Sequence, residues 1–424
     1  MNSRRTLFKN SSKLAADKGL FPLSTEELSA APIPKPRINS IDALRGFALI
    51  GLLLIHSLEH FGLWSTQKLD SPTLQWIDTS VRDVIFFIFQ GKAYAIFSFL
   101  FGLSFFMMMD SQAKKGIDFR LRFLWRLAIL FVFGFLSGMM YHSEWLLIYA
   151  MFGVVIIPLF KVPSKILIVL GILLFLEIPS VIDFISQLSG KTSEPSRIMQ
   201  AMSQIYRDGS NIKTDGSMLE VIKYNAIKGH SAEVLYVLNA RALQMIGLFI
   251  SGMLVGRSEV YKFPDKMVYW SKKVLPYAIG WFLVCYLISW LLPNFGLQRR
   301  VLRVGVSLFK TYGNLGMMMM YICGLIILYY KTISGRKILD KLAPVGRMSV
   351  TNYMMQSILG SFIFYGYGLG LSTQNYIVSF IIGSSLCLLQ ILYSNWWINR
   401  FYYGPMEWLW RVLTWFKKIP FKRK

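Results

Sequence analysis

Ten apolar stretches, each long enough to cross a lipid bilayer as a helix, dominate this sequence of 424 residues. Hydrophobic residues make up 54% of the chain, more than a soluble domain of this length needs. Because a spanning helix takes about 20 mostly apolar residues, the sequence predicts an all-α, polytopic integral membrane bundle of about 10 transmembrane helices. The expected spans cover about 41–62, 82–109, 120–140, 143–160, 164–187, 234–256, 270–292, 305–330, 346–369 and 375–398.

Three regions follow from this pattern. Residues 1–40 form a basic tail, residues 41–398 form the transmembrane domain, and residues 399–424 form an amphipathic, basic tail. Within the domain, residues 65–80 are expected to form a polar loop and residues 189–233 a non-cytoplasmic cap of short helices. Lys and Arg gather in both tails and in alternate loops, which predicts that both termini are cytoplasmic. Three arginines oppose this arrangement, because they would lie outside and line an entrance for an anion unless a span is miscounted: Arg299, Arg300 and Arg303.

The formal net charge of +24 would suggest nucleic-acid binding in a soluble protein. Here the basic residues lie in short loops between apolar stretches, which is typical of membrane orientation and contact with anionic lipid. The sequence therefore predicts a lipid bilayer as partner and no nucleic acid. Cys285, Cys323 and Cys387 lie inside apolar stretches, and the histidines lack zinc-site spacing, so no disulfide framework and no metal are expected. Residues 1–40 lack the apolar core of a cleavable signal peptide.

The first span carries a row of ionisable side chains. On a helix, Asp42, Arg45, His56, Glu59 and His60 share one stripe, and His56 lies roughly 16 Å along the axis from Arg45. Ionisable groups in a spanning helix are costly, so this stripe should face protein or a water-filled cavity. His56 is the candidate general base, with Glu59 and His60 to orient it or relay its proton. The alternative is a histidine whose hydrogen bonds are satisfied by a neighbouring helix.

Basic residues are expected near the cytoplasmic end of the same site. Arg45 could hold a phosphate or carboxylate bidentately, whereas a structural ion pair with Asp42 is the alternative reading. Lys92, Arg122 and Arg126 are expected at similar depth, where with Arg45 they would make a basic pocket for an anionic cofactor.

Further polar residues mark the last third of the chain. Arg347, Asn352 and Gln356 lie at the start of the ninth span as candidate substrate-site or structural residues, with hydrogen bonding between helices as the default explanation. Glu407 and Arg411 are expected to form a structural pair one helical turn apart in the C-terminal tail.

Four segments carry a resemblance to a known family: INSIDALRGFALIGLLLIH, GKAYAIFSFLFGLSF, GRMSVTNYMMQS with FYGYGLGL, and YGPMEWLWR. Over most of residues 38–415 the chain resembles the YeiB-like proteins of domain-of-unknown-function family 418 (DUF418). That family is grouped with the transmembrane acyltransferases, whose acyltransferase-3 members carry an arginine, ten residues and a histidine on the first helix. Arg45 and His56 have this spacing, so the resemblance implies that His56 is catalytic and that Arg45 supports the donor site. The chain departs from the family where many members carry Asn in place of His56, and where Ser143 and Glu144 replace Gly-Asp. Glu144 keeps a carboxylate at that position.

The resemblance implies a multi-pass acyltransferase of the bacterial inner membrane. It would move an acetyl-like acyl group from cytosolic acyl-coenzyme A, the co-substrate, to a hydroxyl or amine of a cell-envelope glycan or lipid. Arg45, Lys92 and Arg126 would hold the donor phosphates, and one water-filled tunnel would connect them to His56. The rival hypotheses are a transporter that uses the polar stripe as a proton or substrate path, and a scaffold in which the stripe joins helices. A homodimer is a further hypothesis.

Overall fold

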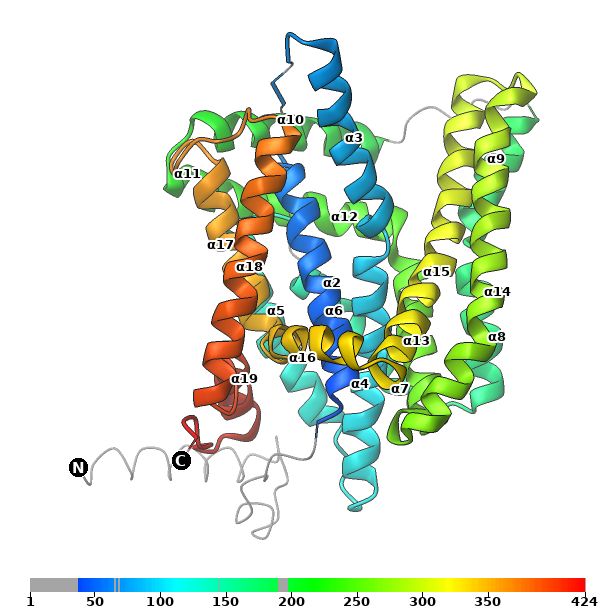
Figure 1. Cartoon of the computed structure of the whole chain (residues 1–424), viewed down its shortest axis with the longest axis vertical. Helices are drawn as coiled ribbons and strands as arrows, with labels where there is room; N and C mark the ends of the chain where they lie inside the picture. The colour runs from blue at the N-terminus through cyan, green and yellow to red at the C-terminus, as the bar shows by residue number, and fades with distance from the viewer. Residues whose placement is uncertain (1–36, 65, 68, 144, 190–196, 424) are drawn as a thin grey trace.

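The computed structural model describes residues 37–423 apart from 65, 68, 144 and 190–196, and its regular elements within these residues are helices (Figure 1). The first half contains α2 (Asn39–Leu58), α3 (Pro72–Phe89), α4 (Ala93–Ala113), α5 (Arg120–Gly138), α6 (Trp145–Gly153), α7 (Ile156–Leu159), α8 (Ser164–Phe175) and α9 (Ile178–Leu188). The second half contains α10 (Arg197–Asp215), α11 (Met218–Tyr224), α12 (His230–Ala240), α13 (Ala242–Arg257), α14 (Pro264–Leu291), α15 (Arg299–Lys331), α16 (Ile333–Arg347), α17 (Ser349–Phe364), α18 (Tyr376–Arg400) and α19 (Pro405–Trp415). The all-α prediction is confirmed.

Seven helical segments of the described chain are long and apolar enough to cross a membrane, or eight if the bent pair of α11–α12 and α13 is one span. The multi-pass character is therefore supported. The described residues of all ten predicted stretches are largely helical, but at least two stretches fall short of a full span. Residues 143–160 divide into the short helices α6 and α7, and α17 has only 16 residues.

The second predicted span is longer than expected and broken. Together α3 and α4 form a segment of 42 residues that starts at Pro72, so most of the predicted loop 65–80 is helical instead. The chain breaks at Gln90–Lys92, because Gly91 adopts a positive φ of 80°. A side chain there would collide with Asn314 of α15, so glycine permits the close approach of these two segments.

Helix α2 is the central helix of the bundle. Of its most apolar 18-residue window, 78% is buried, against 50% or less for the other single candidate spans. It lies among α4, α16 and α18 (Figure 1). Gly46 of α2 and Gly346 of α16 face each other's backbone, where an added Cβ would collide, so these glycines permit the two helices to cross closely.

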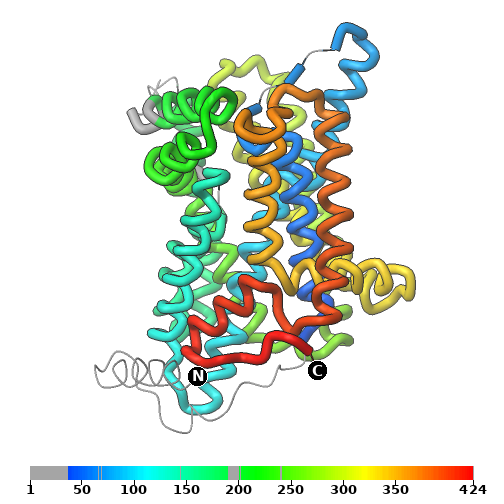
Figure 2. The backbone as a smooth tube through the Cα atoms, turned by 90° about the vertical axis from the view of Figure 1, so that its left-hand side faces the viewer, coloured from blue at the N-terminus to red at the C-terminus, as the bar shows by residue number. Residues whose placement is uncertain are grey.

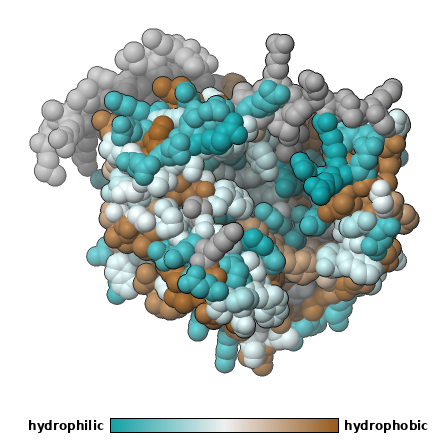
Figure 3. Space-filling view, turned by 90° about the horizontal axis from the view of Figure 1, so that it is seen from above, coloured by the Kyte–Doolittle hydropathy of each residue, from teal (hydrophilic) through white to brown (hydrophobic). Residues whose placement is uncertain are grey.

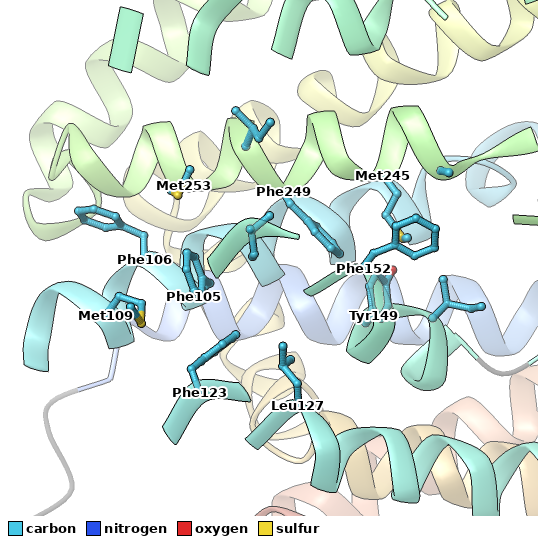
Figure 4. Close-up of a cluster of buried hydrophobic side chains, with 14 of the residues drawn as sticks. Phe105, Phe106, Met109, Phe123, Leu127, Tyr149, Phe152, Met245, Phe249 and Met253 are labelled. Atoms are coloured by element: carbon cyan, nitrogen blue, oxygen red, sulfur yellow. The ribbon is translucent and has the colours of Figure 1, made fainter. Parts of the chain in front are cut away.

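The apolar core lies mainly between α4, α5, α6 and α13 (Figure 4). Aromatic and Met side chains fill it, including Phe105, Phe123, Phe249 and Met253. A second glycine crossing, Gly102 of α4 against Gly252 of α13, brings two backbones together beside this core. In contrast, only 17% of the apolar window is buried in both the α8–α9 and the α14 segments, which indicates faces turned to lipid.

Short helices cover one end of the bundle. Helices α10, α11 and α12 lie across the end where α2 finishes, and we call them the cap (Figures 1 and 2). Hydrophilic side chains cover much of the face at this end (Figure 3). The start of α2, α19 and the C-terminal segment lie at the opposite end (Figure 2). Within residues 189–233, the described residues form α10, α11 and the start of α12.

Candidate functional site

His56 lies in the last turn of α2 and is buried in protein, with 6% of its surface exposed. Its Nδ1 lies 3.1 Å from the Tyr141 hydroxyl and 3.4 Å from Glu59 Oε2. The Tyr141 ring packs edge-on against the imidazole. Nε2 is also buried, and it has no hydrogen-bond partner among the described residues. The imidazole is thus held through one nitrogen while the other stays available.

His60 is turned away from His56, contrary to the prediction that the two act together. The helix ends at Leu58, and His60 and Phe61 adopt positive φ angles of 49° and 51°, so the chain reverses there. The His60 Nε2 lies 2.7 Å from Ser379 Oγ on α18. Burial lowers the pKa of His60 to about 4, so this imidazole is neutral at neutral pH.

A second pair of nitrogen bases adjoins His56 from the cap side. His142 directly follows Tyr141 in the chain, and its Nδ1 lies 2.8 Å from the Lys213 Nζ of α10. Burial lowers the pKa of Lys213 to about 7 and that of His142 well below its ordinary value. A cavity of about 10 Å³, enough for one water molecule, borders both side chains.

Glu233 of α12 completes this polar cluster. It is buried, with 4% exposed, and it interacts electrostatically with Glu59 and Lys213. Sequence reasoning missed Tyr141, Lys213 and Glu233, because no local pattern separates the latter two from the other charged residues of the 189–233 stretch. Only the tertiary fold brings the cap beside the end of α2.

Arg45 lies at the other end of α2 in an ion-pair network. Its guanidinium donates to Asp42 Oδ1 at 2.7 Å and to Ser104 Oγ at 2.5 Å. Asp42 Oδ2 also lies 3.7 Å from Arg37 and 3.6 Å from Arg347. One carboxylate therefore interacts with three guanidinium groups. This geometry agrees with the alternative interpretation, in which Asp42 and Arg45 form a structural ion pair.

The other predicted phosphate-holding residues do not join Arg45. Lys92 donates to Phe87 O at 2.7 Å and lies twelve residues before Ser104, roughly 18 Å along α4 from the level of Arg45. On α5, Arg122 donates to Thr414 O, and Arg126 lies 3.7 Å from the ring centre of Trp410. The predicted basic pocket of Arg45, Lys92, Arg122 and Arg126 is therefore wrong, because α19 covers the arginines and the helix break displaces Lys92.

The predicted tunnel between Arg45 and His56 is also wrong for this conformation. Buried hydrocarbon fills the interval, with Leu49 and Leu52 of α2 packed against Ala93, Val345 and Tyr353. Two cavities lie away from this interval, one in the cap and the other at the opposite end of the bundle. Neither is lined by Arg45 or His56.

Polar residues of α17 join helices together, as their default explanation predicts. Asn352 donates to Val345 O and Ser394 Oγ, both at 3.0 Å, and Gln356 donates to Gln390 Oε1 at 3.0 Å. Glu407 of the predicted Glu407–Arg411 pair accepts hydrogen bonds from the start of α17. Glu144 lies outside the described residues.

These features define a polytopic helical protein whose central helix carries a buried histidine site at one end and an arginine network at the other. Residues 255–417 match a family described as "Protein of unknown function (DUF418)". The chain is 28% identical over 411 residues to the uncharacterized protein YxaH of Bacillus subtilis (strain 168), covering 92% of this chain and 96% of that protein. It is 26% identical over 392 residues to the uncharacterized protein YeiB of Escherichia coli (strain K12), covering 88% and 95% respectively. A third relative, an uncharacterized 39.9 kDa protein of Bacillus acidopullulyticus, is 25% identical over 91% of this chain and 95% of its own length. These matches confirm the predicted resemblance to the YeiB-like proteins of this family.

Proposed function

We propose that this protein is an acyltransferase of the bacterial inner membrane, in which His56 is the general base. The acyl group would pass from acyl-coenzyme A to a hydroxyl or amine of an envelope glycan or lipid. The observation that supports this function best is the arrangement of the His56 imidazole. It is buried, its Nδ1 faces Glu59 and Tyr141, and its Nε2 has no partner among the described residues.

This arrangement suits proton abstraction. A carboxylate next to Nδ1 favours the tautomer that carries its proton there, which leaves the Nε2 lone pair free. In the proposed reaction Nε2 takes the proton of the acceptor hydroxyl while the acceptor oxygen attacks the thioester carbonyl carbon. The C–S bond then breaks, and the imidazolium returns the proton to the leaving thiolate. Glu59 stabilises the transient positive charge on the ring.

Substrates reach Nε2 only when the packing around the imidazole opens. Lys213 and Glu233 of the cap, together with His142, lie on the cap side of His56. Movement of the cap would therefore expose an already polar region, whereas the Arg45 side is closed by packed hydrocarbon. We expect at least the acceptor to enter from the cap end.

Membranes that contain the protein test this proposal when they are incubated with acetyl-coenzyme A labelled in its acetyl group. We expect label to enter the lipid or glycan fraction with the wild type and to fall to the background of empty membranes with His56→Ala. Equal labelling by the two proteins would contradict the mechanism. Solute flux in proteoliposomes without a labelled product would favour the transporter hypothesis instead.

A further inference from the structure

A basic pocket lies at the end of the molecule opposite the cap, and the proposed acyl transfer does not use it. It has a volume of about 280 Å³ and is lined by Arg37, Asn39, Arg347, Tyr402, Tyr403 and Arg423. We call it the basic pocket. It lies where the start of α2 meets the C-terminal segment (Figure 2).

The C-terminal segment is fixed in place beside this pocket. An antiparallel bridge joins Phe401 to Lys422, and the Arg423 backbone N–H donates to Arg400 O at 2.9 Å. The Trp408 indole also donates to Ile419 O at 2.9 Å. These contacts hold Arg423 at the pocket wall. A tail that served only as a surface anchor would not need such backbone pairing.

Positive charge exceeds negative charge around the basic pocket. Asp42 lies behind the wall and is already shared by Arg37, Arg45 and Arg347. The Arg423 guanidinium lies 5.5 Å from the ring centre of Tyr402 and has no ion-pair partner among the residues that the structure describes. Arg347 Nε lies 3.6 Å from Asp42 Oδ2 without forming a hydrogen bond, and its Nη2 donates to Asn39 Oδ1 at 2.5 Å. An anion in the pocket would neutralise this excess.

The donors fit a phosphate group. Guanidinium groups bind phosphate oxygens through paired, charge-assisted hydrogen bonds, and tyrosine hydroxyls can add neutral ones. The pocket also borders Asn39, the first residue of α2, where backbone N–H groups and the helix dipole favour a negative charge.

We infer that the basic pocket binds a phosphate group, carried either by a soluble phosphate ester or by the headgroup of an anionic phospholipid. Asn39 precedes His56 by 17 residues on α2, roughly 26 Å along the helix. The inference is therefore independent of the chemistry proposed at His56, and either one can fail alone.

Binding measurements on the purified full-length protein test this inference. For the soluble source, glycerol 3-phosphate is titrated by calorimetry into protein in an uncharged detergent, at constant ionic strength set with sodium chloride. For the lipid source, retention of phosphatidylglycerol against phosphatidylcholine is counted by native mass spectrometry. Three variants are compared with the wild type: Arg423→Gln and Arg347→Gln in the pocket, and Arg400→Gln as the control.

Arg400→Gln is a matched control, because it removes the same charge at the same end of the molecule. The Arg400 side chain stacks on Trp396 and does not line the pocket. We expect Arg423→Gln to weaken binding of the phosphate-bearing probe by about tenfold or more, and Arg400→Gln to leave it nearly unchanged. Arg423→Gln breaks no ion pair seen among the described residues, so it should remain folded, which size-exclusion elution will check.

The two arms separate the sources of the phosphate. Binding of glycerol 3-phosphate that is weakened by Arg423→Gln and not by Arg400→Gln supports a soluble ligand. Selective retention of phosphatidylglycerol that is lost in the same variant supports a lipid. Absence of binding in both arms would overturn the inference. An equal loss in Arg423→Gln and Arg400→Gln would also overturn it, since that result would show attraction by surface charge alone.

Discussion

Replacement of Glu407 by alanine should strongly destabilise the protein, although this residue lies far from His56. Glu407 of α19 is buried, and its Oε1 accepts from the Val350 N–H at 2.6 Å and from the Thr351 N–H at 3.1 Å. Its Oε2 accepts from the Thr351 hydroxyl at 2.6 Å. The carboxylate thereby satisfies the first turn of α17, whose N-terminal N–H groups have no partner within their own helix.

The size of the effect follows from these contacts. Glu407→Ala leaves two backbone N–H groups without this acceptor, at about 1–3 kcal/mol for each buried unpaired group. We therefore expect a loss of about 2–6 kcal/mol in the free energy of unfolding. Glu407→Gln keeps one acceptor oxygen and should cost less. Because α17 carries Asn352 and Gln356, the alanine variant should also loosen contacts of α17 with α16 and α18.

Unfolding of the purified protein in detergent, followed by tryptophan fluorescence, measures this loss. A double-mutant cycle with Thr351→Val isolates the contact, and we expect a coupling energy of about 0.5–3 kcal/mol. Glu259→Ala is the control, since its carboxylate is exposed and pairs with Lys114 and Lys262 at the surface. The reasoning fails if Glu407→Ala is no less stable than this control, or if its effect and that of Thr351→Val simply add.

Two further predictions concern packing and pH. Gly102→Ala should lower the unfolding temperature markedly, because its Cβ would collide with the Phe249 backbone. Gly324→Ala is the control and should leave that temperature nearly unchanged, since no atom lies within 4 Å of a Cβ there. Similar shifts of the unfolding temperature in both variants would refute the close crossing of α4 and α13. The pKa of Lys213 is about 7 when folded against 10.5 for an unperturbed lysine, so the unfolded chain binds more protons between these values. The free energy of unfolding of the wild type, minus that of Lys213→Met, should therefore rise as the pH is raised from about 7 towards 10. A difference that stays constant across that range would contradict the burial of this amine.

Most helices could be predicted from the sequence, because a spanning helix is a local property of about 20 apolar residues. The predicted span 120–140 corresponds to α5 at Arg120–Gly138, and 375–398 corresponds to α18 at Tyr376–Arg400. The burial of His56 also followed from local reasoning, since ionisable groups in such a helix avoid lipid.

The parts of the site that depend on chain reversals and distant contacts could not be predicted. His60 leaves the helical stripe because two non-glycine residues adopt left-handed backbone conformations, for which the sequence carries no clear signal. Arg126 is covered by Trp410, a contact across 284 positions. The pairing of Lys213 with His142 likewise depends on how the cap folds over the bundle.

The central claim, that the Nε2 of His56 acts as the base, is tested most directly by comparing two histidines at the same end of α2. Initial rates of acyl transfer from labelled acetyl-coenzyme A are measured for the wild type, His56→Gln and His60→Gln at equal amounts of folded protein. General-base catalysis is worth about 10²–10⁴-fold, so His56→Gln should lose at least about a hundredfold. His60→Gln should stay close to the wild type, because its ring points to Ser379. Equal rates for wild type and His56→Gln, or an equal loss in both variants, would contradict the account.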